Sequence, residues 1–137
     1  MSAVVATHEF WETFFSQRRT PPDPSEQSEA LEWYVDVGVA EDHVMARLAE
    51  CDRHRTRILH MGCGSSELGV RLSQKHGFTD VLDSDFSNVV VTQMRARFPS
   101  HSFVAMDAMA MPLLDSSVDV MICKVGAPRR GRVVCAR

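Results

Sequence analysis

The sequence lacks the features that would indicate a membrane protein, a metal-binding protein or a nucleic-acid-binding protein. No apolar run approaches the length of about 18 residues that a membrane-spanning helix requires, and the N-terminus has no apolar signal core. The net charge of −3 provides no basic surface for nucleic acid. Cysteines are few and show no C-x-x-C spacing of the metal-binding kind; they stand at positions 51, 63, 123 and 135. These absences favour a cytoplasmic protein with reduced thiols and no resident metal.

What remains is the composition of an ordinary globular domain. The 137 residues are 45% hydrophobic and 24% charged, enough to bury one core. Composition divides the chain into three parts. Residues 1–36 hold an aromatic helix and a Pro/Ser-rich link, residues 37–124 form the core, and residues 125–137 are a Gly/Arg-rich tail.

The most informative segment is residues 58–68, where an apolar strand runs into two glycines and then a helix start. Asp85 follows Gly64 by about 20 residues, at the end of the next apolar run. Glycines allow the backbone to approach a ligand, and an acid at the neighbouring strand end can accept hydrogen bonds from ribose hydroxyls. The segment therefore predicts a site for a nucleoside-bearing cofactor.

The turn itself discriminates between cofactors. A dinucleotide site requires a third glycine in the pattern G-x-G-x-x-G, and Glu67 stands there instead. A carboxylate at this point would face a pyrophosphate unfavourably. The uncharged pair Ser65-Ser66 suits a ligand with one nucleoside and an amino-acid tail. A dinucleotide-binding module of an oxidoreductase is the alternative interpretation.

Apolar periodicity predicts strands alternating with helices. Strands are expected at 57–61, 79–84, 102–106 and 118–123, with helices at 8–19, 41–52, 66–76 and 88–98, the last capped by Ser87. This alternation predicts an α/β fold, a partial doubly wound, Rossmann-like parallel sheet of about four strands. We expect the strand order 3-2-1-4, with helices on both faces.

Four ordered motifs carry a resemblance to a known family. They are Gly62-Cys63-Gly64-Ser65-Ser66-Glu67-Leu68, Asp85-Phe86-Ser87 with the valines that follow, Phe103-Val104-Ala105-Met106-Asp107, and the N-terminal strings Phe10-Trp11-Glu12 and Glu32-Trp33-Tyr34. Over about residues 8–124 the chain resembles the class I S-adenosylmethionine-dependent methyltransferases. It is most similar to the branch that includes the lysine and N-terminal methyltransferases of translation elongation factor 1-alpha.

The resemblance implies S-adenosylmethionine as cofactor and assigns its contacts. Gly62, Cys63 and Gly64 would lie close to the amino-acid end of the cofactor, and Arg18 would contact its carboxylate. Asp85 would bind the ribose. Phe86 would lie against the adenine ring, and Asp107 with Ala108 would bind the adenine amino edge. Asp83 competes with Asp85 for the ribose role, and we prefer Asp85 because a helix cap follows it. The helix at 8–19 is either a lid over the cofactor or an amphipathic helix docked on the core. His60, where many members have an acid that touches the methionine amino group, is expected to be a core residue.

The resemblance also implies a protein lysine as substrate, with a translation factor as one candidate, and it assigns no catalytic nucleophile. The branch's Asp-Lys-Gly signature is Cys123-Lys124-Val125 here, and the fold's later strands are not apparent. A catalytically silent fragment is therefore the alternative to an active enzyme. We expect the tail after Lys124 to be a short disordered end or the product of an altered reading frame or splice. Without further strands, residues 118–123 would be an exposed edge that favours association with another chain.

Overall fold

The structure, a computed structural model, describes residues 7–28, 36–123 and 132–134. In chain order the elements are α1 (His8–Ser16), α2 (Val37–Leu48), β1 (Arg57–Met61), α3 (Leu68–Gln74), β2 (Asp80–Asp85), α4 (Asn88–Arg97), β3 (Ser102–Ala105), β4 (Val120–Cys123) and β5 (Arg132–Val134). The string at 32–34 and Lys124, both used in the sequence comparison, lie outside the described residues. Each helix that the structure describes is too short or too polar to cross a lipid bilayer.

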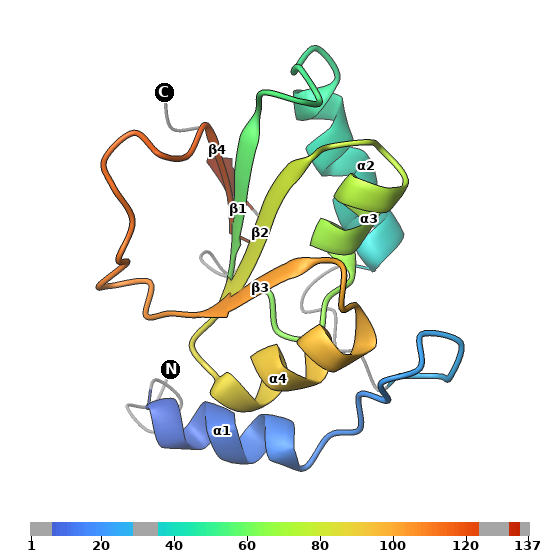
Figure 1. Cartoon of the computed structure of the whole chain (residues 1–137), viewed down its shortest axis with the longest axis vertical. Coiled ribbons are helices and arrows are strands. Elements are labelled where there is room, and N and C mark those ends of the chain that lie inside the picture. Colours follow the sequence, from blue (N-terminus) through green and yellow to red (C-terminus); the bar gives the residue numbers. More distant parts are fainter. Residues whose placement is uncertain (1–6, 29–35, 124–131, 135–137) are drawn as a thin grey trace.

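The strands form one sheet in the order β3-β2-β1-β4-β5, with the first four parallel (Figure 1). The expected fold class and the order 3-2-1-4 are thus confirmed. Helices α3 and α4 are the crossovers that parallel neighbours require. The register pairs Met61 with Ser84, so β1 and β2 end together at the same edge of the sheet. This places the glycine turn (residues 62–64) beside Asp85.

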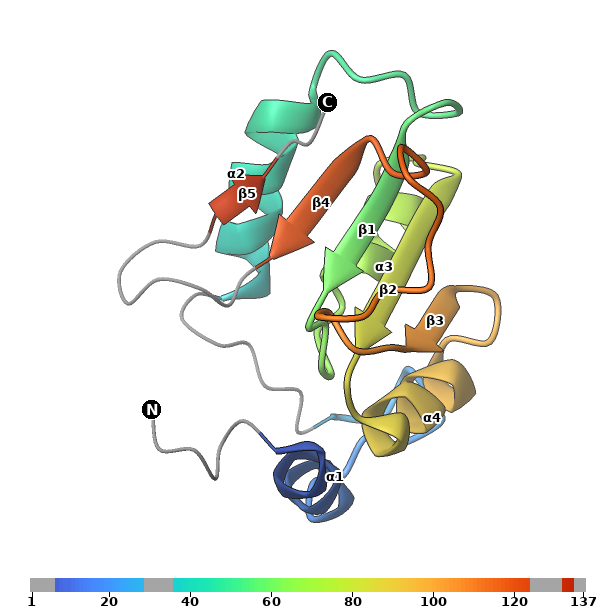
Figure 2. The ribbon, with the colours of Figure 1, turned by 90° about the vertical axis from the view of Figure 1, so that its left-hand side faces the viewer.

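The helices α2, α3 and α4 pack on one face of the sheet, over two clusters of buried side chains. One cluster joins α2 and α3 to β1, β2 and β4, and the other joins α1, α3 and α4 to β3. Figure 2 shows the opposite face crossed by the segment 106–119 between β3 and β4. We expected helices on both faces of the sheet, and in the described part of the chain they cover one face. The other face is crossed by this segment.

Side-chain caps fix the starts of α4 and α2. The Ser87 hydroxyl accepts from the Val90 N–H and begins α4 at Asn88, as predicted. Helix α2 begins four residues earlier than the predicted 41, because the Asp36 carboxylate accepts from the Gly38 N–H at 2.7 Å and caps it. The apolar pattern alone did not reveal that cap.

The expectation of an exposed edge at residues 118–123 is wrong. β5 runs antiparallel beside β4 and pairs Cys123 with Arg132, Ile122 with Val133 and Met121 with Val134. Two adjacent valines suffice for a short strand because β-branched residues favour extended backbone. The Gly/Pro/Arg composition around them concealed this pattern. β4 is therefore an interior strand. Within the described part of the chain it has no free edge that would favour association with another chain.

A buried carboxylate ties α2 to α3. Glu41 is 3% exposed and contacts three basic side chains of the α3 segment, the cations Arg71 at 2.9 Å and Lys75 at 2.7 Å and the imidazole of His76 at 2.7 Å. The hydrogen bonds from Lys75, His76 and Arg71 outweigh the effect of burial and lower the Glu41 pKa from 4.5 to about 2. The ionised carboxylate is therefore part of the helix packing.

We expect this cluster to make the protein acid-sensitive. A carboxyl whose pKa is lower in the folded state contributes stability above its unfolded pKa of 4.5, and this is lost as the pH falls toward about 2. Glu41→Gln should therefore lower the urea midpoint at pH 7 and leave it less dependent on pH below 4.5. Glu50→Gln, at an exposed glutamate beyond the end of the same helix, is the matched control. Equal acid dependence in wild type and Glu41→Gln would contradict this role.

Candidate functional site

The glycine turn has a backbone that favours glycine. Gly62 and Gly64 have φ angles of 61° and 51°, in the left-handed region that other residues rarely adopt. Between them, the Cys63 N–H donates to the Ser84 carbonyl at 2.9 Å and holds the turn against β2. A Cβ on Gly64 would lie 3.3 Å from the Phe15 ring. The turn is therefore both conformationally restricted and closely packed.

Asp85 lies beside this turn and is bonded to it. Its carboxylate accepts from the Gly64 N–H at 2.8 Å and from the Ser87 N–H at 3.0 Å. Burial raises the Asp85 pKa, against the opposing effect of these N–H donors. A carboxylate offers about four lone-pair sites, so this one can accept further hydrogen bonds. The same residue thus organises the turn and keeps acceptor capacity for a ligand.

Asp83, the competing acid, faces the core. It is fully buried and accepts hydrogen bonds from His60 Nδ1 at 2.7 Å and from His101 Nε2. Burial pushes its pKa upward, but the hydrogen bonds from His101 and His60 outweigh burial and lower the pKa. Asp85 is therefore the carboxylate at the turn. His60 is completely buried in this network, consistent with the core role expected for it.

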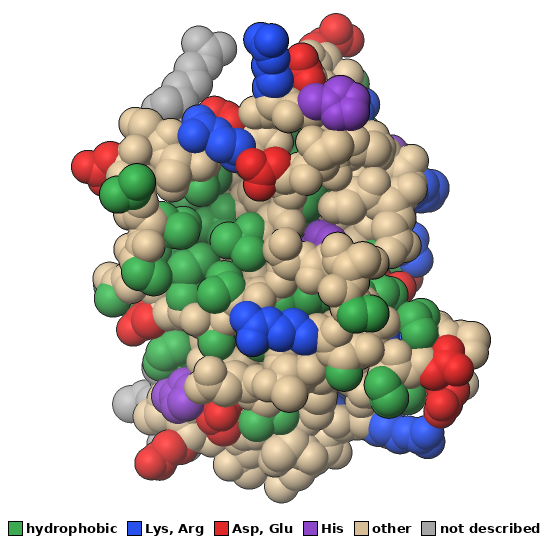
Figure 3. Space-filling model, in the orientation of Figure 1, with side chains coloured by type: hydrophobic (Ala, Val, Ile, Leu, Met, Phe, Trp, Pro, Cys, Tyr) green, Lys and Arg blue, Asp and Glu red, His purple; other side chains and the backbone are tan. Residues whose placement is uncertain are grey.

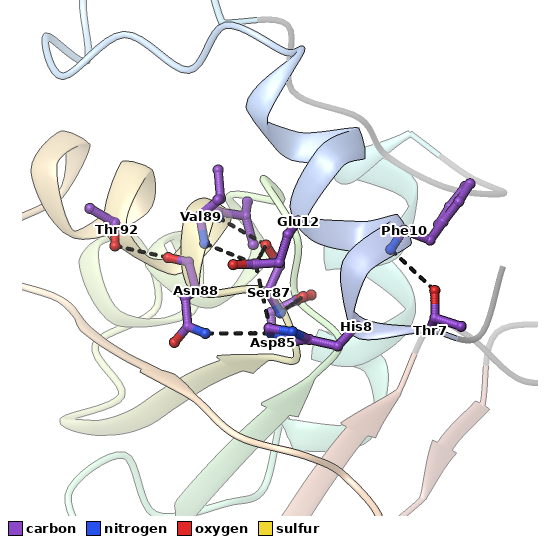
Figure 4. Close-up of polar contacts among 10 residues, drawn as sticks. Thr7, His8, Phe10, Glu12, Asp85, Ser87, Asn88, Val89 and Thr92 are labelled. Atoms are coloured by element: carbon purple, nitrogen blue, oxygen red, sulfur yellow. Dashed lines mark hydrogen bonds and ion pairs between the residues drawn. The ribbon is translucent and has the colours of Figure 1, made fainter. Parts of the chain in front are cut away.

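Helix α1 lies beyond the carboxyl ends of the strands, beside α4 (Figures 1 and 2). Glu12 of α1 accepts from the Ser87 hydroxyl at 2.6 Å and from the Val89 N–H at 3.2 Å, as Figure 4 shows. Burial acts to raise the Glu12 pKa, but the bonds from Ser87 and Val89 outweigh it and lower the pKa. Sequence reasoning missed this contact. One signal was present in the sequence. Ser87 caps α4, but the residue three positions later is not the Glu or Gln that completes a capping box, which leaves room for an acid from elsewhere in the chain.

The remaining predicted contacts surround the same region. The Phe86 ring meets His8 of α1 edge to face, with centroids 4.8 Å apart. The Arg18 guanidinium lies 4.2 Å from the Phe14 ring centre, and its buried Nε has no hydrogen-bond partner among the described residues. The Asp107 carboxylate accepts from the Met109 N–H.

The ends of β2 and β3 are joined directly, and Ala108 lies in the exposed segment that follows them. The Met106 N–H donates to the Asp85 carbonyl at 2.9 Å. This bond brings the end of β3 to Asp85. Ala108 is an exposed residue of the segment 106–119.

The link after α1 is anchored by one buried arginine. Arg97, 4% exposed, donates to the carbonyls of Pro21, Asp23, Pro24 and Glu26. It also lies 3.6 Å from the Glu67 carboxylate. The Pro/Ser-rich link expected after the N-terminal helix is thus exposed over residues 22–27 but held to α4. The carboxylate of Glu67, whose position in the glycine turn motif disfavours a pyrophosphate ligand, is paired with this guanidinium.

One cavity lies away from the turn. It measures about 620 Å³ and extends along the segment 106–119 to Arg57 and Asp119, at the amino ends of β1 and β4. Of the predicted contact residues, Ala108 lines this cavity. Figure 3 shows hydrophobic side chains gathered on the side where Figure 1 draws this segment. Because the glycine turn and Asp85 lie at the carboxyl ends, we assign the candidate site there and not to this cavity. Within residues 7–28, 36–123 and 132–134, no group of three or more His, Cys, Asp or Glu residues could hold a metal ion.

Comparison with known proteins identifies the domain type. The family model described as a methyltransferase domain matches residues 58–130. The human eEF1A lysine and N-terminal methyltransferase is 32% identical over 124 residues, covering 85% of this chain and 15% of that protein. EEF1A lysine methyltransferase 4 of Bos taurus is 36% identical over 100 residues, covering 71% of this chain and 37% of that protein. The chain thus spans about 15% of the length of the first of these relatives.

A solved structure supports the fold. An S-adenosylmethionine-dependent methyltransferase from Clostridium acetobutylicum superposes with a TM-score of 0.54 at 19% identity, covering 66% of this chain and 37% of that one. At this identity the likeness concerns the fold alone. The matched family model and the parallel sheet agree on the same architecture.

Proposed function

The chain belongs to the methyltransferase domain family, and on that premise we propose that it binds S-adenosylmethionine and transfers the methyl group to a protein lysine. One observation carries the proposal. The Asp85 carboxylate, at the end of β2, is held by N–H groups of both the glycine turn and the start of α4. This is the position where an acid meets the ribose of a nucleoside cofactor.

The residues around Asp85 suit S-adenosylmethionine. The glycine turn has no Cβ between the backbone and the ligand, and Asp85 retains acceptor sites for the ribose hydroxyls. In this proposal, Gly62, Cys63 and Gly64 contact the amino-acid end of the cofactor, and Arg18 binds its carboxylate. Asp85 binds the ribose, and Phe86, Asp107 and Ala108 contact the adenine. The buried Nε of Arg18, without a partner in the described part, fits an anionic ligand group.

When bound, the cofactor supplies a sulfonium-activated methyl group. The protein's share is to bind, to orient the acceptor in line and to exclude water, and no side-chain nucleophile is required. A lysine acceptor must also lose its proton before it attacks. The names of the relatives specify lysine and N-terminal methylation of eEF1A, and a translation factor is the corresponding substrate candidate.

A second candidate is a module that binds the cofactor without transferring its methyl group. It is favoured by Cys123, which stands where the family has an acid at the end of this strand. A thiol there is a weaker hydrogen-bond acceptor for the incoming lysine than the two oxygens of a carboxylate. The two candidates share the same cofactor site and differ only in turnover.

Replacing Asp85 tests both candidates. Asp85→Ala removes an acceptor whose hydrogen bonds are worth about 1.5–3 kcal/mol each, so we expect affinity for S-adenosylmethionine to fall about tenfold to a hundredfold. The measurement is binding of tritium-labelled S-adenosylmethionine together with methyl incorporation into cell-lysate proteins. Asp80→Ala, at the exposed start of the same strand, is the matched control.

The two readouts separate the candidates. Incorporation that depends on Asp85 establishes the enzyme. Binding that depends on Asp85 without any incorporation establishes the silent module. A folded wild type that binds no labelled S-adenosylmethionine contradicts both.

A further inference from the structure

Ser87 is a junction between the candidate site and two helices. Its N–H donates to the Asp85 carboxylate at 3.0 Å, and its hydroxyl accepts from the Val90 N–H at 3.3 Å. The same hydroxyl donates to Glu12 at 2.6 Å, and Ser87 is fully buried. The position of the Asp85–Ser87 turn is therefore fixed in part by a side chain 75 residues earlier in the chain.

Glu12 makes this contact with a single oxygen. Its Oε1 accepts both the Ser87 hydroxyl and the Val89 N–H, so it holds the first turn of α4 at two points (Figure 4). An acid near a helix N-terminus is also favoured by the helix dipole. His8, one turn earlier on α1, lies 3.9 Å from the same oxygen.

Phe15 brings α1 into contact with the other side of Asp85. Its ring is 3% exposed and packs over Gly64, whose N–H is the second donor to the Asp85 carboxylate. Helix α1 thus touches both residues whose N–H groups hold Asp85, Gly64 through Phe15 and Ser87 through Glu12. These two contacts connect the docking of α1 to the geometry of the ribose-binding acid.

We infer that Glu12 is a positioning residue, which clamps α1 onto the start of α4 through Ser87 and thereby holds Asp85 in place for the ribose of the cofactor. The inference rests on the proposed function for its ligand. Because coupling between two sites is reciprocal, cofactor bound at Asp85 also stabilises the docked α1. Helix α1 then acts on affinity for the methyl donor through Asp85.

The clamp can be tested without any ligand, by amide hydrogen exchange followed by NMR. In Glu12→Ala we expect the Gly64 and Ser87 amides to exchange about tenfold faster, since the hydrogen bonds that restrain their turn are lost. Glu12→Gln keeps an oxygen that can accept both hydrogen bonds and should restore most of the protection. Glu9→Ala, on the exposed side of the same helix, is the matched control and should change neither amide.

The ligand-bound arm uses S-adenosylhomocysteine. We expect about tenfold weaker binding in Glu12→Ala, and near wild-type binding in Glu12→Gln and Glu9→Ala. In a turnover assay Glu12→Ala should raise KM for S-adenosylmethionine and leave kcat unchanged, because a saturating concentration of cofactor compensates for weaker binding.

The two arms fail in distinguishable ways. If Glu12→Ala is folded and its Gly64 and Ser87 amides remain as protected as in wild type, the inference is overturned. Unchanged S-adenosylhomocysteine affinity in that variant overturns it equally. A wild type that does not bind S-adenosylhomocysteine contradicts the proposed function, while the exchange rates still decide whether Glu12 holds the Asp85 turn.

Discussion

Replacing Asp83 with Ala is expected to lower the free energy of unfolding by about 3–5 kcal/mol, a large part of the stability of a small domain. Asp83 is completely buried and accepts hydrogen bonds from His60 and His101. Removing its carboxylate leaves both imidazoles without this partner inside the core, where an unsatisfied polar group is costly. Urea unfolding at pH 7 measures the change.

Two variants separate hydrogen bonding from charge and packing. Asp83→Asn keeps a side chain of the same size that can still bond both rings after a change of tautomer, so its cost should be smaller. Asp80→Ala, at the exposed start of the same strand, should fall within about 0.5 kcal/mol of wild type. An Asp83→Ala protein as stable as Asp80→Ala would contradict a structural role for the buried network.

Gly69 provides an independent check of the same packing. A Cβ at Gly69 would overlap the Asp83 carboxylate, so α3 approaches β2 closely at this point. Gly69→Ala should therefore be destabilising alone, and less so in combination with Asp83→Ala, because the overlap is then absent. Such non-additivity is what residues in direct contact produce.

Asp83 also gives a pH dependence of defined sign. Its pKa is lower in the folded state than the usual 3.8, so its contribution to stability is present above that value and is lost as the pH falls below it. In Asp83→Asn this part of the acid dependence should vanish.

Replacing Gly64 with Arg is expected to abolish binding of S-adenosylmethionine and S-adenosylhomocysteine. The backbone there has φ 51°, and the first side-chain atom already lies 3.3 Å from the Phe15 ring, so the longer chain must displace Phe15 or enter the cofactor site. Either outcome disturbs the N–H that holds Asp85. A thermal-shift titration measures the effect, because a ligand that binds only the folded state raises the unfolding midpoint.

Gly77→Arg is the control for backbone strain. Gly77 has φ 78° but open space around its Cβ position, so an arginine there carries a similar conformational cost without touching the site. We expect Gly77→Arg to unfold at a lower temperature and still respond to ligand. A ligand response that survives in Gly64→Arg would contradict the assignment of the glycine turn to the cofactor.

The parallel core could be predicted from the sequence because each element has a local signal. Alternating apolar strands and helices gave the order of the first four strands, and the predicted bounds of β1 and the cap at Ser87 agree with the structure. The candidate site could be predicted for the same reason. The glycine turn and Asp85 end neighbouring parallel strands, and such ends meet at one edge of the sheet.

Features that depend on distant contacts could not be predicted. Nothing local to Glu12 indicates that it caps α4, and nothing near Arg97 indicates that it binds four carbonyls of the link after α1. The strand β5 was missed because three residues surrounded by Gly, Pro and Arg carry little periodicity. Its partner β4 supplies the ordering that the short segment lacks.

The central claim is that the glycine turn and Asp85 form the site for S-adenosylmethionine, and an NMR titration of the nitrogen-15-labelled protein tests it most directly. Adding S-adenosylhomocysteine should saturably shift the amides of Gly62, Gly64 and Ser87 together with that of Asp107, and NAD at the same concentration should not. Shifts confined to the cavity beside Met109 and Met121, or the same turn responding to NAD instead, would contradict the claim.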